Sequence, residues 1–307
     1  MVIRTGFMFS RNAILLTLFG LLPWFSSFAQ NKKSIPALED SLRILASEIR
    51  RSDKDSLKSL LNEKYLGLLK RSLDNPSTFT YPFDSLKTIG KLYSPDKTFR
   101  IYNWNLPRTN GTNKYFCLIQ VKQKKNIRVI ELTDVSDTLN DPEFRILTSG
   151  KWYGALYYKV LMNKVGNKTC YTLLGWDGCS VQKFQKLIEM LTFDGRGGTV
   201  FGARIFRKYN KGKNARVIFA YSSQASMTLR YDQQAIPTGK KKWNPARRAY
   251  DYETRPVWMI IFDQLGALLE SQEGEAVYNV PVGESLDGFL FENSGWNYIQ
   301  GINARNN

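Results

Sequence analysis

The segment of residues 152–232 most constrains the fold, because short runs rich in aromatic and β-branched residues alternate there with compact turns of Gly, Asn and Asp. Two of the expected strands, residues 152–161 and 169–176, carry apolar side chains on both alternating faces. Such a pattern is typical of central strands that are covered on both sides. Since no long helical crossovers separate the strands, we expect an antiparallel meander rather than a parallel sheet.

Helical periodicity is clearest before this β region, although residues 184–193, which are expected to form a strand, also fit a helical stripe through Leu187, Ile188 and Leu191. Apolar residues recur at helical spacing from Leu38 to Ile49 and from Leu57 to Leu69, with Ser52 or Asp53 placed to cap the second helix. The period changes to two from Ile89 onward. We therefore predict a mainly β (α+β) protein, with a helical hairpin at 30–78 and an antiparallel β domain at 79–307. That domain is a sandwich, a barrel or propeller-like, and a polar segment at 233–254 interrupts its strands.

The first 29 residues have the organisation of a secretory signal peptide. Arg4 and Arg11 precede the apolar run 13–25, and Ser27-Phe28-Ala29 places small residues where a signal peptidase cuts. We expect cleavage after Ala29 and a soluble mature chain in the periplasm or outside the cell. No second apolar run is long enough to span a bilayer, so we expect no transmembrane segment in the mature chain.

The charge balance favours an anionic partner. The chain has 44 Lys and Arg against 27 Asp and Glu, a formal net charge of +17. Outside the cytoplasm, an anionic envelope component or extracellular polymer would be attracted to such a surface. The densest cluster of cations has aromatic residues interleaved, so it is a candidate polyanion site; its residues are Lys240, Lys241, Lys242, Trp243, Arg247 and Arg248. The alternative is an exposed loop without a ligand.

Several kinds of catalysis are excluded by residue type. The chain has no histidine, which rules out Ser/His/Asp and Cys/His nucleophilic sites and the usual zinc ligand sets. The turn at 194–198 is glycine-rich, but neither a lysine nor a helix follows as a phosphate loop requires, so we predict no cofactor. A carboxylate-dependent hydrolase of polysaccharide stays open, provided that carboxylates beside strand ends converge. The candidates are Asp194, Asp232, Asp263, Asp287 and Glu292.

Cysteine and tryptophan positions each allow two interpretations. Cys170 and Cys179 flank an expected turn and could form a disulfide if the strand register brings them opposite each other, whereas Cys117 stays unpaired. Burial as small apolar residues is the alternative. Five tryptophans occupy expected strands and could form a carbohydrate platform or, as is more common, the core: Trp104, Trp152, Trp176, Trp258 and Trp296.

Local motifs carry a loose resemblance to other bacterial proteins. Besides the expected cleavage site and the helical pair, these are Tyr81-Pro82-Phe83-Asp84-Ser85-Leu86, Ser94-Pro95-Asp96-Lys97 and Leu174-Gly175-Trp176-Asp177-Gly178. The chain resembles uncharacterised secreted proteins of Bacteroidetes-type Gram-negative bacteria. The resemblance implies a bacterial host and a periplasmic or extracellular location, and it transfers no activity.

The function expected from these features is a non-enzymatic binding or envelope-associated role of an exported protein. The polysaccharide hydrolase is the alternative from a different class. Polyanion binding through the basic segment is a specific form of the first.

Overall fold

The computed structural model describes residues 1–2, 34–124, 126–267 and 279–302. The predicted signal peptide lies almost entirely outside the described residues. Ser34–Asn307 form one compact unit, so the helical hairpin and the β strands belong to the same unit. Within the described residues, no helix is both long enough and apolar enough to cross a membrane.

Two α-helices open this unit, α1 (Ile35–Arg51) and α2 (Asp55–Leu73). The Ser34 hydroxyl caps α1 by accepting a hydrogen bond from the Ala37 N–H. The prediction that Ser52 or Asp53 caps α2 is wrong, because its N-cap is Lys54, which provides no side-chain hydrogen bond. The Asp55 carboxylate in the first turn instead accepts hydrogen bonds from the backbone and hydroxyl of Thr109.

The strands form three sheets. Sheet A has the order β1-β2-β3-β4, sheet C has the order β5-β9-β8-β7-β6 with β11 also paired to β8, and sheet D has the order β10-β15-β14-β13-β12. All described pairings between strands are antiparallel except the short one between β10 and β15.

The strand bounds are β1 (Gly90–Tyr93), β2 (Phe99–Pro107), β3 (Asn113–Lys122), β4 (Ile127–Leu132), β5 (Leu147–Thr148), β6 (Leu156–Val165), β7 (Lys168–Asp177), β8 (Lys183–Phe193), β9 (Thr199–Phe201), β10 (Phe206–Arg207), β11 (Val217–Ser222), β12 (Leu229–Asn244), β13 (Ala249–Ala267), β14 (Asn279–Glu292) and β15 (Gly295–Ile302). Four short 3-10 helices connect them: η1 (Pro76–Thr78), η2 (Ser136–Thr138), η3 (Pro142–Phe144) and η4 (Asn210–Gly212).

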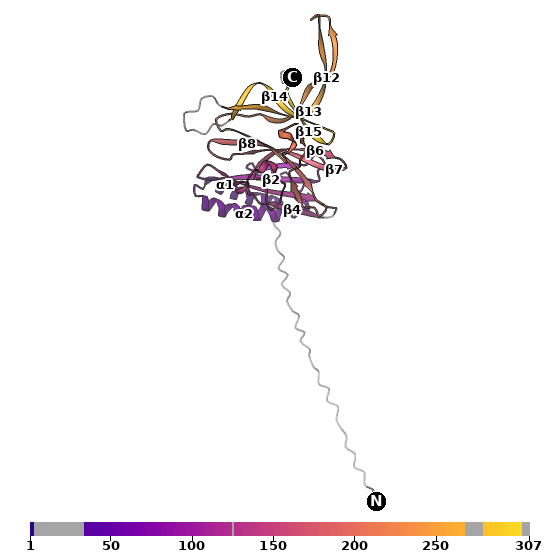
Figure 1. Cartoon of the computed structure of the whole chain (residues 1–307). Helices are drawn as coiled ribbons and strands as arrows, with labels where there is room; N and C mark the ends of the chain where they lie inside the picture. The colour runs from indigo at the N-terminus through magenta and orange to yellow at the C-terminus, as the bar shows by residue number, and fades with distance from the viewer. Residues whose placement is uncertain (3–33, 125, 268–278, 303–307) are drawn as a thin grey trace. The chain divides into compact units, whose positions relative to one another are not determined.

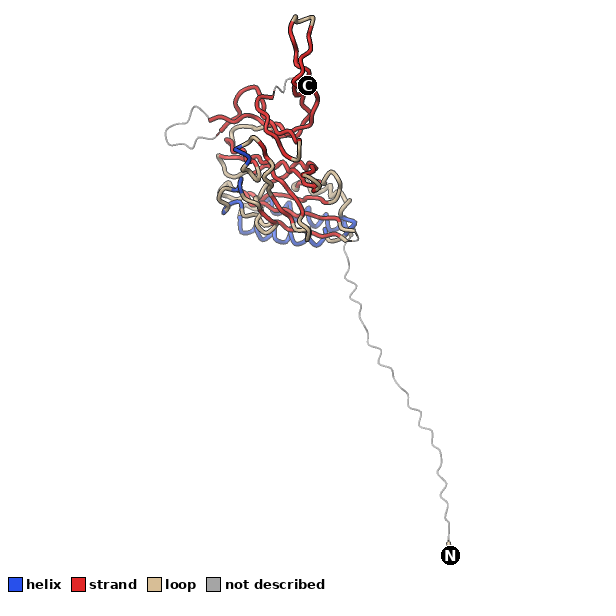
Figure 2. The backbone as a smooth tube through the Cα atoms, turned by 45° about the vertical axis from the view of Figure 1, so that its right-hand side comes forward, coloured by secondary structure: helices blue, strands red, loops and turns tan. Residues whose placement is uncertain are grey.

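These elements stack as four layers, with the helical hairpin on sheet A, sheet A on sheet C, and sheet C on sheet D (Figure 1). Figure 2 shows the helices on one outer side of the stack and the ribbon of β12 and β13 extending from the other. One apolar cluster lies between each pair of neighbouring layers. The cluster between the helical hairpin and sheet A includes Leu69 and Tyr102, and the cluster between sheets A and C includes Phe99 and Leu173. The cluster between sheets C and D includes Phe262. The mainly β, α+β prediction is confirmed, and the described strands form stacked open sheets.

Sheet C is covered on both faces by another sheet, as the sequence pattern of residues 169–176 predicted. The same expectation is wrong for residues 152–161, because β6 is the edge strand of sheet C and exposes Tyr158 and Met162. Along β7, Leu173 packs toward sheet A while Leu174 packs toward sheet D, and both are fully buried. Residues 184–193, which also fit a helical stripe, form strand β8. Trp296 of sheet D donates a hydrogen bond to the Thr172 hydroxyl at 3.0 Å, which adds a polar connection between the two sheets.

The expected interruption at 233–254 is wrong, because these residues form a β-hairpin from β12 and β13. β13 pairs with β14 only from Met259 onward, so residues 249–258 pair with β12 alone. A ribbon beyond the sheets has neither face buried, and its strands therefore need no alternating apolar pattern. That pattern was the signal by which the other strands were recognised.

A buried ion pair joins β8 to the residue that precedes β11. Arg216 and Glu189 are both completely buried, and Arg216 Nε lies 2.6 Å from Glu189 Oε2. Arg216 also donates to the carbonyl of Pro142, and the Met190 N–H donates to Glu189 Oε1. The pair therefore connects the η3 region to sheet C, and removal of either partner would leave the other charge buried alone.

We expect Arg216→Leu to lower the free energy of unfolding by about 3–5 kcal/mol, because Glu189 loses its counter-ion in the interior. Urea unfolding followed by tryptophan fluorescence measures this change. The matched control is Arg43→Leu, which removes the exposed pair of Arg43 with Asp40 and should cost less than about 1 kcal/mol. Equal losses of unfolding free energy in the two variants would contradict the conclusion that burial makes the Arg216–Glu189 pair essential to the fold.

Candidate functional site

The six residues predicted to bind polyanions all lie at the tip of the β12–β13 hairpin, which extends beyond the stacked sheets (Figure 1). Asn244 closes the tip, where its side-chain oxygen accepts hydrogen bonds from the backbone of Ala246 and Arg247. Such a turn needs no tertiary contact to form, since the asparagine side chain satisfies backbone donors locally. The tip is therefore ordered by its own sequence.

A bulge bends the ribbon just before the tip. Gly239 has φ +83°, and the register shifts between Pro237 and Lys241. Extra residues on one strand increase the local twist and change the direction of the hairpin. An open space surrounds Gly239, so backbone conformation rather than crowding favours glycine there.

One face of the ribbon carries exposed aromatic rings beside a lysine. Trp243 lies opposite Tyr250, with ring centroids 5.2 Å apart, and Lys241 lies opposite Tyr252, with its ammonium 5.2 Å from that ring. The exposed fractions of Trp243, Tyr250 and Tyr252 are 49%, 64% and 57%. Because these rings contribute little to a core, the face offers flat π surfaces together with a positive charge.

Trp258 extends this face toward the sheets. It lies on the same alternating side of β13 as Tyr250 and Tyr252, it stacks on Tyr231 at 5.4 Å, and it is 55% exposed. The interpretation of tryptophans as core residues is thus confirmed for Trp152, Trp296 and Trp104 and is wrong for Trp258, whereas Trp176 is half-buried.

The cations of the tip are largely uncompensated. Arg247 pairs with Asp251 at 3.4 Å on the other side of the ribbon, where Lys242 also lies opposite Asp251 in the register. In the described part of the chain, no carboxylate forms an ion pair with the remaining cations, which are Lys240, Lys241, Lys242 and Arg248. Their charges are therefore available to an added anion, although the Lys241 ammonium also lies over the Tyr252 ring.

The five candidate carboxylates of the hydrolase hypothesis do not converge as a group. Asp194 accepts hydrogen bonds within its own turn, Asp232 pairs with Arg230, and Glu292 pairs with Arg255. Asp263 and Asp287 do share one pocket of about 450 Å³ between β11 and sheet D.

The oxygens of these two aspartates are already used within the fold. Asp287 accepts hydrogen bonds from the Gln264 amide, the Gly301 N–H and the Tyr298 hydroxyl, and Asp263 accepts one from the Thr228 N–H at 2.6 Å. These contacts connect strand ends, so we interpret both carboxylates as structural. Elsewhere in the described residues, no group of three or more Cys, Asp or Glu residues could hold a metal ion.

The proposed disulfide between Cys170 and Cys179 is wrong, since all three cysteines are free thiols. Cys170 is near the start of β7, and Cys179 follows the end of the same strand. An extended strand rises about 3.3 Å per residue, which separates the two by well over 20 Å. A disulfide requires Cα atoms within about 7 Å.

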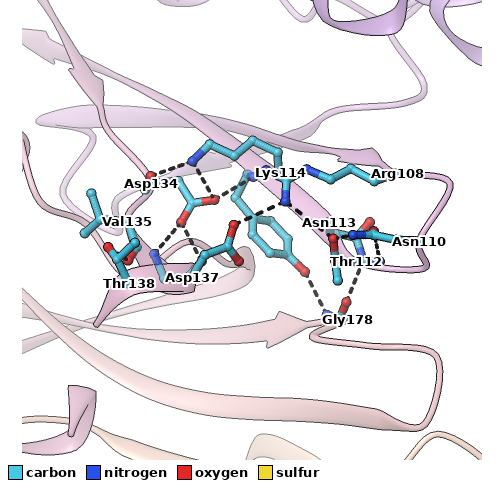
Figure 3. A network of polar contacts seen from close by, with 12 residues as sticks. Arg108, Asn110, Thr112, Asn113, Lys114, Asp134, Val135, Asp137, Thr138 and Gly178 are labelled. Atoms are coloured by element: carbon cyan, nitrogen blue, oxygen red, sulfur yellow. Dashed lines mark hydrogen bonds and ion pairs between the residues drawn. The ribbon is translucent and has the colours of Figure 1, made fainter. Parts of the chain in front are cut away.

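Sequence reasoning missed a buried polar network where sheet A meets the end of β7. Figure 3 shows part of this network. The Asp134 carboxylate forms an ion pair with Lys114 and accepts a hydrogen bond from a backbone N–H of β3, and a tyrosine hydroxyl accepts a hydrogen bond from the Gly178 N–H. That tyrosine is Tyr115 of β3, which also donates to Asp177 Oδ1 at 2.8 Å. Asp177 directly follows the expected strand 169–176 and is the last residue of β7. A carboxylate at a strand end is usually solvated, so its burial was not predicted.

Burial raises the pKa of Asp177 from 3.8 to about 6, although the hydroxyls of Tyr115 and Tyr153 act in the opposite direction. The Tyr153 hydroxyl contacts both Asp177 Oδ2 and Gln185 Oε1, and its single proton can be donated to only one of them. Below its pKa a protonated Asp177 can donate to Tyr153 while Tyr153 donates to Gln185; above it, a Gln185 amide turned by 180° can donate to Tyr153 while Tyr153 donates to Asp177. Because the carboxylate of Asp177 is buried and bonded to Tyr115 of sheet A and to Tyr153, we interpret the network as a contact between sheets.

Comparison of the chain with protein-family models, with curated proteins and with solved structures finds no match. The resemblance to secreted bacterial proteins therefore stays a prediction. The geometry described above is the basis on which function is inferred.

We expect Asp177→Asn to raise the free energy of unfolding at pH 7.5 by up to about 2–3 kcal/mol relative to the unsubstituted chain. The folded-state pKa is raised, so the cost of the buried carboxylate is present above pH 6 and disappears as the pH falls toward 4. The advantage of the variant should therefore shrink at pH 5.0, which urea unfolding at both pH values measures. Asp137→Asn, at an exposed ion pair, is the control and should show no such change.

Proposed function

We propose that this is an exported protein with a non-enzymatic binding function, and that it binds an anionic polymer of the cell envelope or surroundings through the tip of the β12–β13 hairpin. The single observation that carries the proposal is the exposed face on which Lys241, Trp243, Tyr250 and Tyr252 lie together. Export rests on the predicted signal peptide.

The first support for the proposal is electrostatic. Five cations lie between residues 240 and 248, and Asp251 neutralises only one of them, Arg247. Each cation that contacts a phosphate or sulfate group displaces a condensed counter-ion, so binding is strengthened by entropy and weakened by salt. The formal net charge of +17 would add a long-range attraction for the same partner.

The second support for the proposal is the set of exposed aromatic rings. Trp243 and its neighbours would provide stacking surfaces for bases or sugar rings, and each stacked base contributes about 1–3 kcal/mol in single-strand binding proteins. Because the β12–β13 ribbon is accessible from both sides, it can lie along an extended polymer without enclosing it. This geometry fits an extended polymer better than a small molecule, since the rings and cations are exposed along the ribbon.

We expect neutralisation of the tip by Lys240→Gln, Lys241→Gln, Lys242→Gln and Arg248→Gln to weaken binding to single-stranded DNA and to heparin. If all four cations contact phosphates, the slope of log affinity against log salt for DNA should become shallower by about 3, at about 0.7 for each lost contact. Fluorescence anisotropy across a salt series measures this slope.

The matched control removes the same charge elsewhere, at the exposed residues Lys54, Lys64, Lys164 and Lys168. Trp243→Ala separates the two kinds of polymer, because it should weaken DNA binding with little change of salt slope and affect heparin less. An equal loss in the tip variant and the control variant would show that net charge acts without a site and would overturn the proposal.

A further inference from the structure

A second concentration of positive charge lies in the segment that contains β10 and leads to β11. Residues 204–213, here called the cationic loop, contain five exposed cations and no acidic residue. The cations are Arg204, Arg207, Lys208, Lys211 and Lys213. In the described part of the chain, none of them forms an ion pair with a carboxylate. Since β10 and β12 are the two edge strands of sheet D, this cluster is separate from the β12–β13 tip.

The two ends of the cationic loop are joined, and its middle is anchored. The Ala203 N–H donates a hydrogen bond to the Ala215 carbonyl at 2.8 Å. The Tyr209 ring packs edge-to-face against Phe289 and Tyr298, with ring centroids 5.4 and 5.5 Å apart. Compact surface loops whose ends meet are frequently functional. The five charges therefore lie on a short segment that is fixed to the core.

The backbone of the cationic loop is unusual where its lysines lie. Lys208, Asn210 and Lys211 have φ of +60°, +43° and +56°, in the left-handed region that a lysine rarely adopts. The Gly212 N–H donates to the Tyr209 carbonyl at 2.7 Å, which closes a tight turn. Strained backbone of this kind clusters at ligand-binding sites. The turn also holds lysine charges close together, and a bound anion would offset their mutual repulsion.

Arg207 is positioned by the neighbouring strands. Its Nη2 atom donates a hydrogen bond to the Asn293 carbonyl at 2.7 Å, in the turn between β14 and β15. A guanidinium has five N–H donors in a planar fork, so the remaining donors can contact the oxygens of a phosphate or sulfate group. Arg207 thus supplies one oriented cation beside the flexible side chains of the lysines.

The cationic loop presents charge without a stacking surface. Its two rings, Phe206 and Tyr209, pack into the core between sheets C and D. Burial and the nearby carboxylates of Asp287 and Glu143 raise the pKa of the Tyr209 hydroxyl, and neither carboxylate forms an ion pair with a described cation of the loop. Recognition here would therefore differ from recognition at the tip, where Trp243 is exposed.

We propose that the cationic loop is a second polyanion-binding site, which contacts the phosphate or sulfate groups of an extended polymer through charge alone. Arg207 provides an oriented guanidinium, and the other four cations provide charges that no described carboxylate neutralises. The site uses none of the residues of the tip, so it does not depend on the function proposed for them. A polymer that has no rings should bind to it.

The test uses the full chain and a loop variant, in which Arg204→Gln, Lys208→Gln, Lys211→Gln and Lys213→Gln remove four charges and Arg207 keeps its contact with Asn293. For single-stranded DNA, the slope of log affinity against log salt should become shallower by about 3, at about 0.7 for each lost contact. Inorganic polyphosphate, which has neither bases nor sugars, should bind to the loop variant more than about tenfold more weakly at low salt. Fluorescence anisotropy measures the first change, and isothermal titration calorimetry measures the second.

Two controls separate the site from net charge and from the tip. Neutralisation of Lys54, Lys64, Lys164 and Lys168 removes the same charge from exposed positions outside the loop and should change polyphosphate affinity much less. Trp243→Ala removes a ring of the tip and should leave polyphosphate affinity unchanged. Circular dichroism and thermal unfolding establish that each variant is folded before its affinity is interpreted.

Equal losses of polyphosphate affinity in the loop variant and the lysine control would overturn the proposal, because net charge would then act without a site. Unchanged polyphosphate affinity in the loop variant would also overturn it, even if the tip variant still loses affinity for DNA, so the two proposals can fail separately. Sedimentation with phosphatidylglycerol vesicles that needs the loop, without any binding of polyphosphate, would assign the loop to a membrane surface and overturn the proposal.

Discussion

Burial of both faces of sheet C is the constraint on which the rest of the structure depends. Leu173 and Leu187 pack against sheet A, and Leu174 and Ile188 pack against sheet D, so the other two sheets are held together through this one. Each fully buried side chain of this size contributes about 1.5–3 kcal/mol by removal of apolar surface from water. The hairpin of α1 and α2 then covers the outer face of sheet A, which would otherwise expose Tyr102 and Trp104.

Stacking of this kind creates buried polar groups that must find partners between layers. Trp296 bonds to Thr172 between sheets D and C, Tyr115 bonds to Asp177 between sheets A and C, and Arg216 neutralises Glu189. These contacts account for the most perturbed carboxyl groups. A raised carboxyl pKa in this protein therefore marks a buried structural contact, between sheets A and C at Asp177 and within sheet C at Glu189, although such shifts often indicate catalytic sites.

The polyanion site proposed on the β12–β13 hairpin lies where the stack ends. The β12–β13 hairpin is long because β14 no longer pairs with β13 before Met259, and the free ribbon exposes both of its faces. The tip of this hairpin is cationic, which agrees with the strongly positive charge of the chain.

The sequence by itself determined the local elements: two amphipathic helices, the strand pattern of β7, and the basic, aromatic composition of residues 240–252. Periodicity and turn residues act through nearest neighbours, so they are readable along the chain. Only the tertiary structure decided that Asp177 and Tyr65 are buried, because burial depends on contacts between residues distant in sequence, which local patterns do not record. The hairpin at 233–254 and the separation of Cys170 from Cys179 are local features. They were missed because an exposed ribbon lacks the alternating apolar pattern and because most of the residues between the two cysteines belong to strand β7.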